Sequence, residues 1–340
     1  MNPDAIVNSI SVIGAGSWGT TLANLLAEKG YPVTLWGYES DLVERMQRRH
    51  ENDLYLPGFA LSENLTFTDS LTEAVTGKKL LLLVPPSQVM RQVVRQFAGQ
   101  LDDEVLIVSA AKGIENESLM LMSQVLEELL PVSLHPRLAY LSGPSFAREV
   151  SAHMPTAVVA AARNEQVAVT VQQVFNTEKF RVYTHTDIIG VELGGAMKNV
   201  IALAAGVADG LGFGHNTRAA LITRGLAEMN RIGLVLGGTS ETFAGLAGMG
   251  DLVLTCTGDL SRNRSVGIEL GKGRKLNEIL SGMQMVAEGV KTTLSAYQLA
   301  QKLGVEAPII EQMYQILYQE KDPAQAVTDL MLRDLKAESL

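Results

Sequence analysis

The sequence predicts an α/β domain over residues 1–187, built on a mostly parallel, doubly wound sheet, followed by an all-α domain over residues 188–340. In the first half, short apolar runs alternate with longer amphipathic stretches, which is typical of repeated strand–helix–strand units. A glycine-rich turn follows the first apolar run, and strand signals stop after about Asp187. With 340 residues and 46% apolar side chains, the chain is long enough to bury two cores.

The predicted strands are short runs rich in Leu, Ile and Val, several of them unbroken, as in strands buried on both faces. They lie at residues 10–13, 33–36, 80–84, 105–109, 137–141, 157–161 and 180–183. Amphipathic periodicity predicts helices at residues 20–29, 87–97, 118–130 and 165–175. Pro85 and Pro86 end the third strand because proline cannot extend a ladder. From Ile188 onward, glycine pairs and glycine–serine turns separate one helix from the next.

Composition excludes several classes of function. Because 28 basic residues face 37 acidic ones, the net charge is −9 and gives no general attraction to nucleic acid or an anionic membrane. The single cysteine, Cys256, excludes an intrachain disulfide and favours a reducing compartment. The five histidines show no metal-ligand spacing, residues 1–9 lack the features of a signal peptide, and the small-residue run 200–208 is too short to span a bilayer. We therefore expect a cytoplasmic protein with no metal and no membrane insertion.

The glycine-rich turn contains Gly14, Gly16 and Gly19, between the first predicted strand and an amphipathic helix. In this pattern the first glycine permits a tight turn, the second lets the backbone approach a pyrophosphate, and the third allows close helix–strand packing. The helix that follows supplies amide donors and a favourable dipole. Because the motif sits in a strand–helix–strand unit, it predicts a Rossmann-like, dinucleotide-binding domain.

The residue that reads the adenosine ribose usually lies about 20 positions beyond this turn. Glu39 stands in that region and is suited to the ribose of NAD, whereas Arg45, Arg48 and Arg49 follow closely and are suited to the 2′-phosphate of NADP. Alternatively, Glu39 is solvated and the arginines form an exposed helical face. The sequence leaves this choice open.

Lys198 lies on a predicted helix, with Gly194 one turn before it and Ala202 one turn after it. These small residues share its face and would leave a hollow where a ligand can approach the ammonium group. Gly194 and Gly195 each cost roughly 1 kcal/mol in a helix interior, so a compensating role is expected. The alternative is close helix packing, with the lysine extended to solvent.

Further candidates lie at helix starts and in loops. Asp251 follows two glycines and begins an apolar helix, where it is either a helix cap or a functional carboxylate. Ser261 is placed to cap a helix whose first turn contains Arg262 and Asn263, either a phosphate site or an exposed basic helix start. Lys112-Gly113 and the segment 142–146 follow strands, at the edge where open α/β sheets bind ligands, although ordinary turn chemistry also explains them.

Together these motifs resemble the NAD(P)-dependent glycerol-3-phosphate dehydrogenases in their bacterial form. The resemblance spans almost the whole chain and rests on the order and spacing of Gly14-Ala-Gly16-Ser17-Trp18-Gly19, Lys112-Gly113, Ser142-Gly-Pro-Ser-Phe146, Gly194-Gly-Ala-Met-Lys198-Asn199, Gly250-Asp251-Leu and Ser261-Arg-Asn-Arg264. It implies interconversion of sn-glycerol 3-phosphate and dihydroxyacetone phosphate by hydride transfer with NAD(H) or NADP(H). It also implies a supply of glycerol 3-phosphate for phospholipid synthesis, and a homodimer.

The resemblance also implies roles for single residues. Lys198 would be the general acid/base, Asp251 would orient it, and Lys112 would stabilise the developing oxyanion and touch the cofactor. The substrate would be bound by Lys112, Gly143, Ser145, Lys198, Asn199, Asp251, Ser261, Arg262 and Asn263, with Arg262 gripping its phosphate. The cofactor would contact Gly14, Gly16, Ser17, Trp18, Gly19, Tyr38, Lys112, Ala147, Arg262, Val286 and Glu288. Many relatives have histidine or arginine where this chain has Tyr38, so a preference for NADPH is in doubt.

Two other classes of protein fit part of the pattern. A 6-phosphogluconate or β-hydroxyacid dehydrogenase also joins a Rossmann domain to a helical domain with a lysine after a glycine pair, but would lack the Ser261–Arg264 motif. A non-catalytic dinucleotide sensor would have no need of Lys198, Asp251 and Lys112 together.

Overall fold

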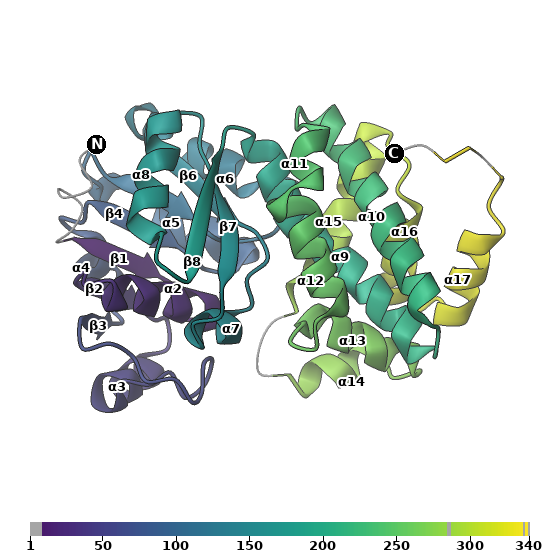
Figure 1. Ribbon diagram of the computed structural model, residues 1–340, viewed down its shortest axis with the longest axis horizontal. Helices are drawn as coiled ribbons and strands as arrows, with labels where there is room; N and C mark the ends of the chain where they lie inside the picture. The colour runs from purple at the N-terminus through teal and green to yellow at the C-terminus, as the bar shows by residue number, and fades with distance from the viewer. Residues whose placement is uncertain (1–8, 284–286, 336, 339–340) are drawn as a thin grey trace. The chain divides into compact units, whose positions relative to one another are not determined.

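The computed structural model describes residues 9–283, 287–335 and 337–338 and divides into two compact units (Figure 1). The first unit comprises Met1–Lys112 and Met122–Ile188, and the second comprises Gly113–Leu121 and Ile189–Leu340. The α/β class of the first part and the helical class of the second are confirmed. Residues 113–121, which the sequence analysis placed in the first domain, group with the second unit instead.

The segment 113–121 belongs to the second unit because of contacts that are distant in sequence. Ile114 and Leu121 form an isolated antiparallel bridge, and both are buried in the core of the second unit. The Ser295 hydroxyl donates to the carbonyl of Ile114 at 3.2 Å. The helix expected from residue 118 therefore begins only at Met122.

The described part of the first unit forms an eight-stranded sheet in the order β3-β2-β1-β4-β5-β6-β7-β8. All neighbouring strands are parallel except β6 and β7, which are antiparallel. The strands are β1 Ile10–Ile13, β2 Val33–Trp36, β3 Leu65–Thr68, β4 Leu80–Leu83, β5 Leu106–Ser109, β6 Leu138–Ser142, β7 Thr156–Ala161 and β8 Phe180–His185. Strand β3 was not predicted, because its four residues, Leu-Thr-Phe-Thr, include two threonines and give a weaker apolar signal than an unbroken run such as β4.

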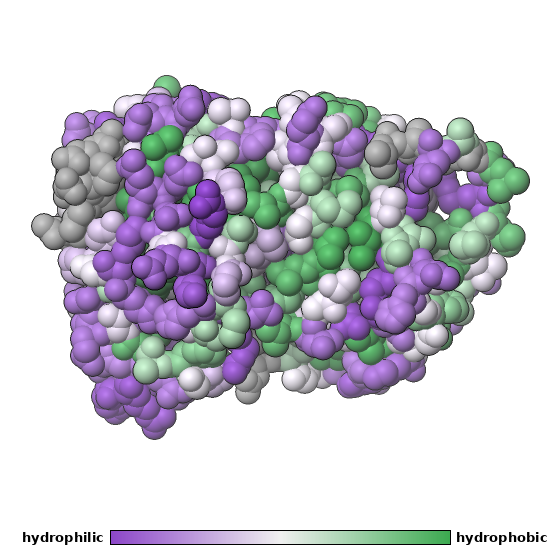
Figure 2. All heavy atoms as spheres, in the orientation of Figure 1, coloured by the Kyte–Doolittle hydropathy of each residue, from purple (hydrophilic) through white to green (hydrophobic). Residues whose placement is uncertain are grey.

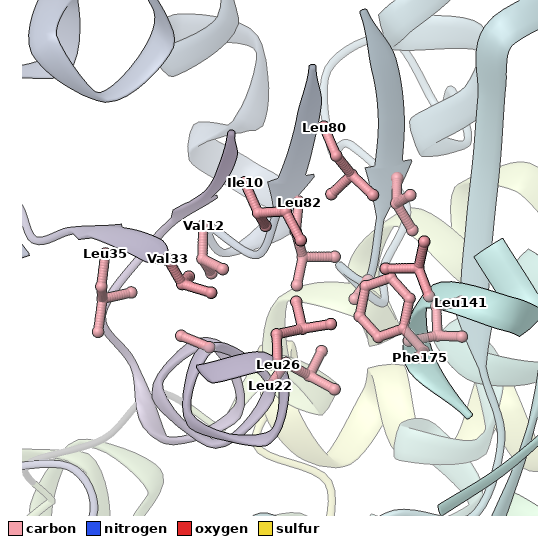
Figure 3. Packing of buried hydrophobic residues seen from close by; sticks show 14 of the residues in the cluster. Ile10, Val12, Leu22, Leu26, Val33, Leu35, Leu80, Leu82, Leu141 and Phe175 are labelled. Atoms are coloured by element: carbon pink, nitrogen blue, oxygen red, sulfur yellow. The ribbon is translucent and has the colours of Figure 1, made fainter. Parts of the chain in front are cut away.

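Helices cover both faces of this sheet (Figure 1). They are α2 Ser17–Glu28, α3 Ser40–Arg49, α4 Leu71–Val75, α5 Met90–Arg95, α6 Met122–Leu129, α7 Ala147–Ser151 and α8 Glu165–Phe175, with short 3₁₀ turns η1 Ser87–Val89, η2 Ala98–Gln100 and η3 Val132–Arg137. Figure 3 shows Leu22 and Leu26 of α2 packed against side chains of β1 and β4. This packing fixes the start of α2 at the carboxyl end of β1, where the glycine-rich turn lies.

The described part of the second unit is helical. Its helices are α9 Ile188–Gly210, α10 His215–Val235, α11 Ser240–Ala244, α12 Asp251–Thr257, α13 Arg262–Gly271, α14 Leu276–Ser281, α15 Glu288–Leu303, α16 Pro308–Tyr318 and α17 Pro323–Met331, with one π-helical turn, η4 Leu246–Gly250. Helix α9 is long and apolar enough to cross a membrane, but 89% of its apolar window is buried inside the structure, as expected of a core helix.

Candidate active site

The glycine-rich turn has the geometry that a dinucleotide pyrophosphate requires. Gly14 has a φ of 116°, and a Cβ there would lie 3.0 Å from the backbone of Val84. A Cβ on Gly19 would lie 1.9 Å from the carbonyl oxygen of Gly14, so both glycines are required by packing. A Cβ on Gly16 would meet no described atom within 4 Å, so packing does not explain this glycine. The space beside it leaves the backbone open to close approach by a ligand, as this glycine pattern predicts.

The first turn of α2 lies beside this turn and contains Ser17 and Trp18. The indole of Trp18 packs against Phe180, with ring centroids 6.5 Å apart, and its Nε1 is a buried donor with no hydrogen-bond partner among the described residues. Thr21 of the same helix donates to the carbonyl of Ala147 at the start of α7. Of the predicted cofactor-binding residues, the structure thus gathers Gly14, Gly16, Ser17, Trp18, Gly19 and Ala147 around the start of α2. These residues fit a dinucleotide.

Asn52 braces the glycine-rich turn, and the sequence analysis missed it. Its amide nitrogen donates to the carbonyl of Ala15 and to the hydroxyl of Thr20, both at 2.8 Å, and its oxygen accepts from the N–H of Tyr55 at 2.9 Å. The side chain is fully buried. An asparagine in a loop carries no sequence signal that separates this role from ordinary turn chemistry.

The predicted ribose region follows β2. The carboxylate of Glu39 accepts a hydrogen bond from the hydroxyl of Tyr55 at 2.7 Å, and Arg45 forms ion pairs with Asp41 at 2.6 Å and with Asp53 at 3.0 Å. Burial and the neighbouring Glu39 raise the pKa of Tyr55 to about 12, so its hydroxyl remains a donor. Tyr38 is 81% exposed, with its ring edge-on to Trp36.

A second group of candidates lies where β5 and β6 end. The ammonium group of Lys112 donates to the carbonyl of Gly143 at 3.0 Å, and the hydroxyl of Ser145 donates to the same carbonyl at 2.9 Å. Gly143 has a φ of 131°, and a Cβ there would lie 3.0 Å from the backbone of Val158. The structure therefore brings together three residues predicted to bind substrate, around one carbonyl group.

In the second unit, Lys198 of α9 and Asp251 of α12 form a buried ion pair. Their Nζ and Oδ1 atoms are 2.5 Å apart, and the two side chains are 10% and 1% exposed. Asp251 is the first residue of α12 and does not act as its N-cap, a position taken by Gly250. The lysine therefore does not extend to solvent, and the aspartate does not cap its helix.

Close packing explains Gly194, one turn before Lys198. A Cβ there would lie 2.4 Å from the carbonyl oxygen of Ala247 in the turn η4, so the glycine lets this turn lie against the backbone of α9. Because η4 leads directly into α12, this contact sets the position of Asp251, the first residue of α12. The hollow expected beside Lys198 is thus filled by chain on the Gly194 side.

Asn199 and Asn263 link three helices. The amide of Asn263 on α13 donates to Asn199 on α9 at 2.9 Å, and its oxygen accepts from the backbone N–H of Gly289 on α15 at 3.0 Å. Both polar atoms of the Asn263 side chain therefore form hydrogen bonds within the protein. Glu288, a predicted cofactor contact, begins α15 next to this link, whereas Val286 lies outside the described residues.

The start of α13 has the features of an anion site. Ser261 caps the helix, as expected, by accepting from the N–H of Arg264 at 3.2 Å. Arg264 is committed to ion pairs with Asp209 and Asp259, at 2.8 and 3.0 Å. Arg262 is exposed and forms no ion pair with the residues that the structure describes. An available guanidinium beside the N-terminal amides of a helix is suited to a phosphate.

Four glycines hold α13 against α9. A Cβ on Gly206 would lie 2.1 Å from the carbonyl oxygen of Arg264, and one on Gly210 would lie 2.2 Å from that of Ile268. Reciprocally, Cβ atoms on Gly267 and Gly271 would collide with carbonyls of α9. The helices therefore touch backbone to backbone, which fixes the start of α13 relative to the helix that carries Lys198.

Cys256 lies in the hydrophobic core of the second unit. The cysteine is fully buried, and burial raises the pKa of its thiol to about 12, so it is not a thiolate at neutral pH. Within the described ranges, the structure shows no cluster of three histidine, cysteine, aspartate or glutamate side chains that could hold a metal ion.

Comparison with known proteins identifies relatives along nearly the whole chain. Residues 9–168 match the family model described as the N-terminus of NAD-dependent glycerol-3-phosphate dehydrogenase, and residues 187–328 match the model of its C-terminus. A glycerol-3-phosphate dehydrogenase [NAD(P)+] of Syntrophotalea carbinolica is 66% identical over 97% of this chain and 99% of its own length. The corresponding protein of Geobacter sulfurreducens is 64% identical over 97% and 98%. A crystal structure of glycerol-3-phosphate dehydrogenase from Coxiella burnetii has a TM-score of 0.91 and 42% identity, over 95% of this chain and 98% of its own.

Replacing Asn52 with alanine tests the brace beneath the glycine-rich turn. The variant leaves the N–H of Tyr55 and two acceptors without their partner, so we expect a loss of about 1–3 kcal/mol in the free energy of unfolding. Because the turn loosens, the Kd for a nicotinamide dinucleotide should rise at least fivefold in a fluorescence titration.

The matched control is Asn64→Ala, which removes one hydrogen bond to Ala27 from an exposed asparagine of the same unit. This control should leave the Kd unchanged. Equal dinucleotide affinity in the Asn52→Ala variant and the native protein would show that the turn needs no brace.

Proposed function

The chain belongs to the NAD-dependent glycerol-3-phosphate dehydrogenase family, and we propose that Lys198, Asp251 and Lys112 carry the proton chemistry of the family's reaction. The enzyme interconverts sn-glycerol 3-phosphate and dihydroxyacetone phosphate by hydride transfer with NAD(P), and supplies glycerol 3-phosphate for phospholipid synthesis. The match to both family models sets aside the 6-phosphogluconate dehydrogenase and sensor alternatives. The observation that carries the residue assignment is the buried ion pair between Lys198 and Asp251.

Lys198 is the group that we assign to proton transfer. In oxidation, the C2–H bond of glycerol 3-phosphate breaks with its electron pair, and the C2 hydroxyl proton passes to Nζ of Lys198. In reduction, the ammonium form of Lys198 gives a proton to the carbonyl oxygen of dihydroxyacetone phosphate. The nicotinamide ring, when bound, accepts or supplies the hydride. Asp251 holds Nζ in one direction, because its carboxylate is a fixed acceptor at 2.5 Å.

We assign to Lys112 the stabilisation of the negative charge that develops on the C2 oxygen of the substrate. Its ammonium group is oriented by the carbonyl of Gly143, which also accepts from Ser145. A cation held in this way stabilises negative charge that develops on the C2 oxygen without reorganising during the reaction. Gly143 and Ser145, which share this carbonyl contact with Lys112, are assigned to the substrate with it.

Arg262 is assigned to the substrate phosphate. Its guanidinium and the N–H groups of the first turn of α13 are donors of the kind that bind phosphate bidentately. Arg264, two residues on, is held by two carboxylates and serves to fix the helix. Ser261 and Asn263 hold the start of α13 in place, and Asn199 connects it to the helix of Lys198.

We further propose that the protein acts as a cytoplasmic homodimer. Figure 2 shows apolar side chains at the surface of the second unit. Leu234 and Val235 on α10 and Val253 on α12 are 39–57% exposed. Large exposed apolar areas usually mark an interface. Light scattering checks the dimer, which should show twice the mass of the chain.

The proposed location in the cytoplasm rests on Cys256, because a free, buried cysteine suits a reducing compartment.

Replacing Lys198 with methionine tests the acid/base assignment. Methionine keeps the apolar stem and removes the proton donor and acceptor. The kcat should therefore fall roughly 10²–10⁴-fold, both for oxidation of glycerol 3-phosphate and for reduction of dihydroxyacetone phosphate. The Kd for the cofactor should stay within about twofold. Lys302→Met, an exposed lysine of α15, is the control and should leave kcat unchanged. Native turnover in the Lys198 variant would contradict the assignment.

Replacing Arg262 with alanine tests the phosphate grip. Loss of charge-assisted hydrogen bonds worth about 1.5–3 kcal/mol should raise the KM for dihydroxyacetone phosphate about 10–150-fold. Dihydroxyacetone, which lacks the phosphate, should be reduced equally poorly by the variant and the native enzyme. Arg274→Ala, an exposed arginine paired with Glu269, serves as the control. An unchanged KM would remove Arg262 from the substrate site.

A further inference from the structure

We propose that this enzyme prefers NADH to NADPH, and that Glu39, held by Tyr55, together with the pairing of Arg45 to two carboxylates, sets the preference. The inference rests on the proposed function, because it concerns the adenosine end of the same cofactor site. The residues involved all lie in the first unit.

Glu39 stands where the adenosine ribose is read. It lies 20 residues beyond Gly19 and three beyond the end of β2, the strand next to β1 and its glycine-rich turn. In this fold a carboxylate at that place accepts a hydrogen bond from the ribose 2′-hydroxyl. The 2′-phosphate of NADPH would instead bring a second negative group to the same carboxylate.

Tyr55 keeps this carboxylate in position. Its hydroxyl donates to Oε1 of Glu39 at 2.7 Å, and its own backbone N–H is held by Asn52, the brace of the glycine-rich turn. A carboxylate offers more acceptor sites than one hydroxyl uses, so Glu39 can still accept from a ribose. Glu39 and the glycine-rich turn are therefore connected through one short segment, residues 52–55.

The arginines that follow are poorly suited to a 2′-phosphate. Arg45 is held between Asp41 and Asp53, and Arg49 pairs with Asp53 at 3.4 Å. Arg48 lies eight residues after Ser40, the first residue of α3, which places it about 12 Å along the helix from its start.

Tyr38, the residue before Glu39, is uncharged and largely exposed. Asp41 and Asp53 hold Arg45 and Arg49 in ion pairs, whereas the carboxylate of Glu39 forms no ion pair with the residues that the structure describes. A phosphate dianion here meets the carboxylate of Glu39 and must compete for Arg45 with two aspartates. We expect at least a tenfold lower affinity for the phosphorylated ribose.

The first experiment uses the native protein and needs no variant. Isothermal titration with 5′-AMP and with 2′,5′-ADP isolates the 2′-phosphate, since the two probes differ only in that group. The Kd for 5′-AMP should be at least tenfold lower, and kcat/KM with NADH should exceed that with NADPH by a similar factor. Equal or tighter binding of 2′,5′-ADP would overturn the proposal.

Variants then identify the residues that cause the preference. Glu39→Gln removes the negative charge, so the ratio of the two probe affinities should fall at least fivefold, mainly through better binding of 2′,5′-ADP. Glu44→Gln is the matched control, because it removes the same charge from an exposed position of α3, and it should leave the ratio unchanged. A fall no larger than that in the control would contradict the role of Glu39.

Two further variants separate position from charge. Tyr55→Phe keeps the charge of Glu39 but releases it, so 5′-AMP should bind at least threefold more weakly. Asp53→Asn frees Arg45 from one partner and should improve the binding of 2′,5′-ADP.

If the probes show the expected preference but dihydroxyacetone phosphate is not reduced with either cofactor, the proposed function fails and the inference on the ribose site stands.

Discussion

The buried ion pair between Lys198 and Asp251 is the interaction on which the helical unit is organised. Removing two charges from water is costly, and losing one partner of such a pair typically destabilises a protein by about 3–5 kcal/mol. The protein accepts this cost at Lys198 and Asp251, where the side chains are 10% and 1% exposed. A well-packed apolar pair would stabilise the fold at least as well, so the charges are better explained by chemistry than by stability.

Several glycines of this unit position the charged side chains assigned to the reaction. Gly194 lets the turn η4 lie on the backbone of α9, which places Asp251 beside Lys198. The contact between α9 and α13 at Gly206 and Gly267 sets the start of α13, and with it Arg262, at a fixed distance from the lysine. Close backbone contacts thus position a proton donor and a phosphate-binding group on two neighbouring helices. Such positioning matters because small displacements of catalytic groups cost large factors in rate.

Local signals were enough for seven of the eight described strands and for the glycine-rich turn, but not for β3 or for contacts distant in the chain. Short, mostly apolar runs predicted the bounds of β1 and β2 correctly, and Ser261 was recognised as a cap from its place before a helix. The bridge at Ile114 was missed because Ser295, far along the chain, helps to hold it. The pairing of Lys198 with Asp251, 53 residues later, depends on how α9 and α12 pack, which no periodicity encodes. Asn52 was missed because a buried bracing asparagine looks like any loop asparagine.

The most direct test of the account is a double-mutant cycle on kcat with Lys198→Met, Asp251→Asn and the double variant, each checked for folding by circular dichroism. If the pair acts as one catalytic unit, Asp251→Asn should lower kcat strongly in the native background and hardly at all in the Lys198→Met background. The double variant should then be about as slow as Lys198→Met alone. If the two losses instead multiply, Asp251 acts independently of Lys198, and the central claim is contradicted.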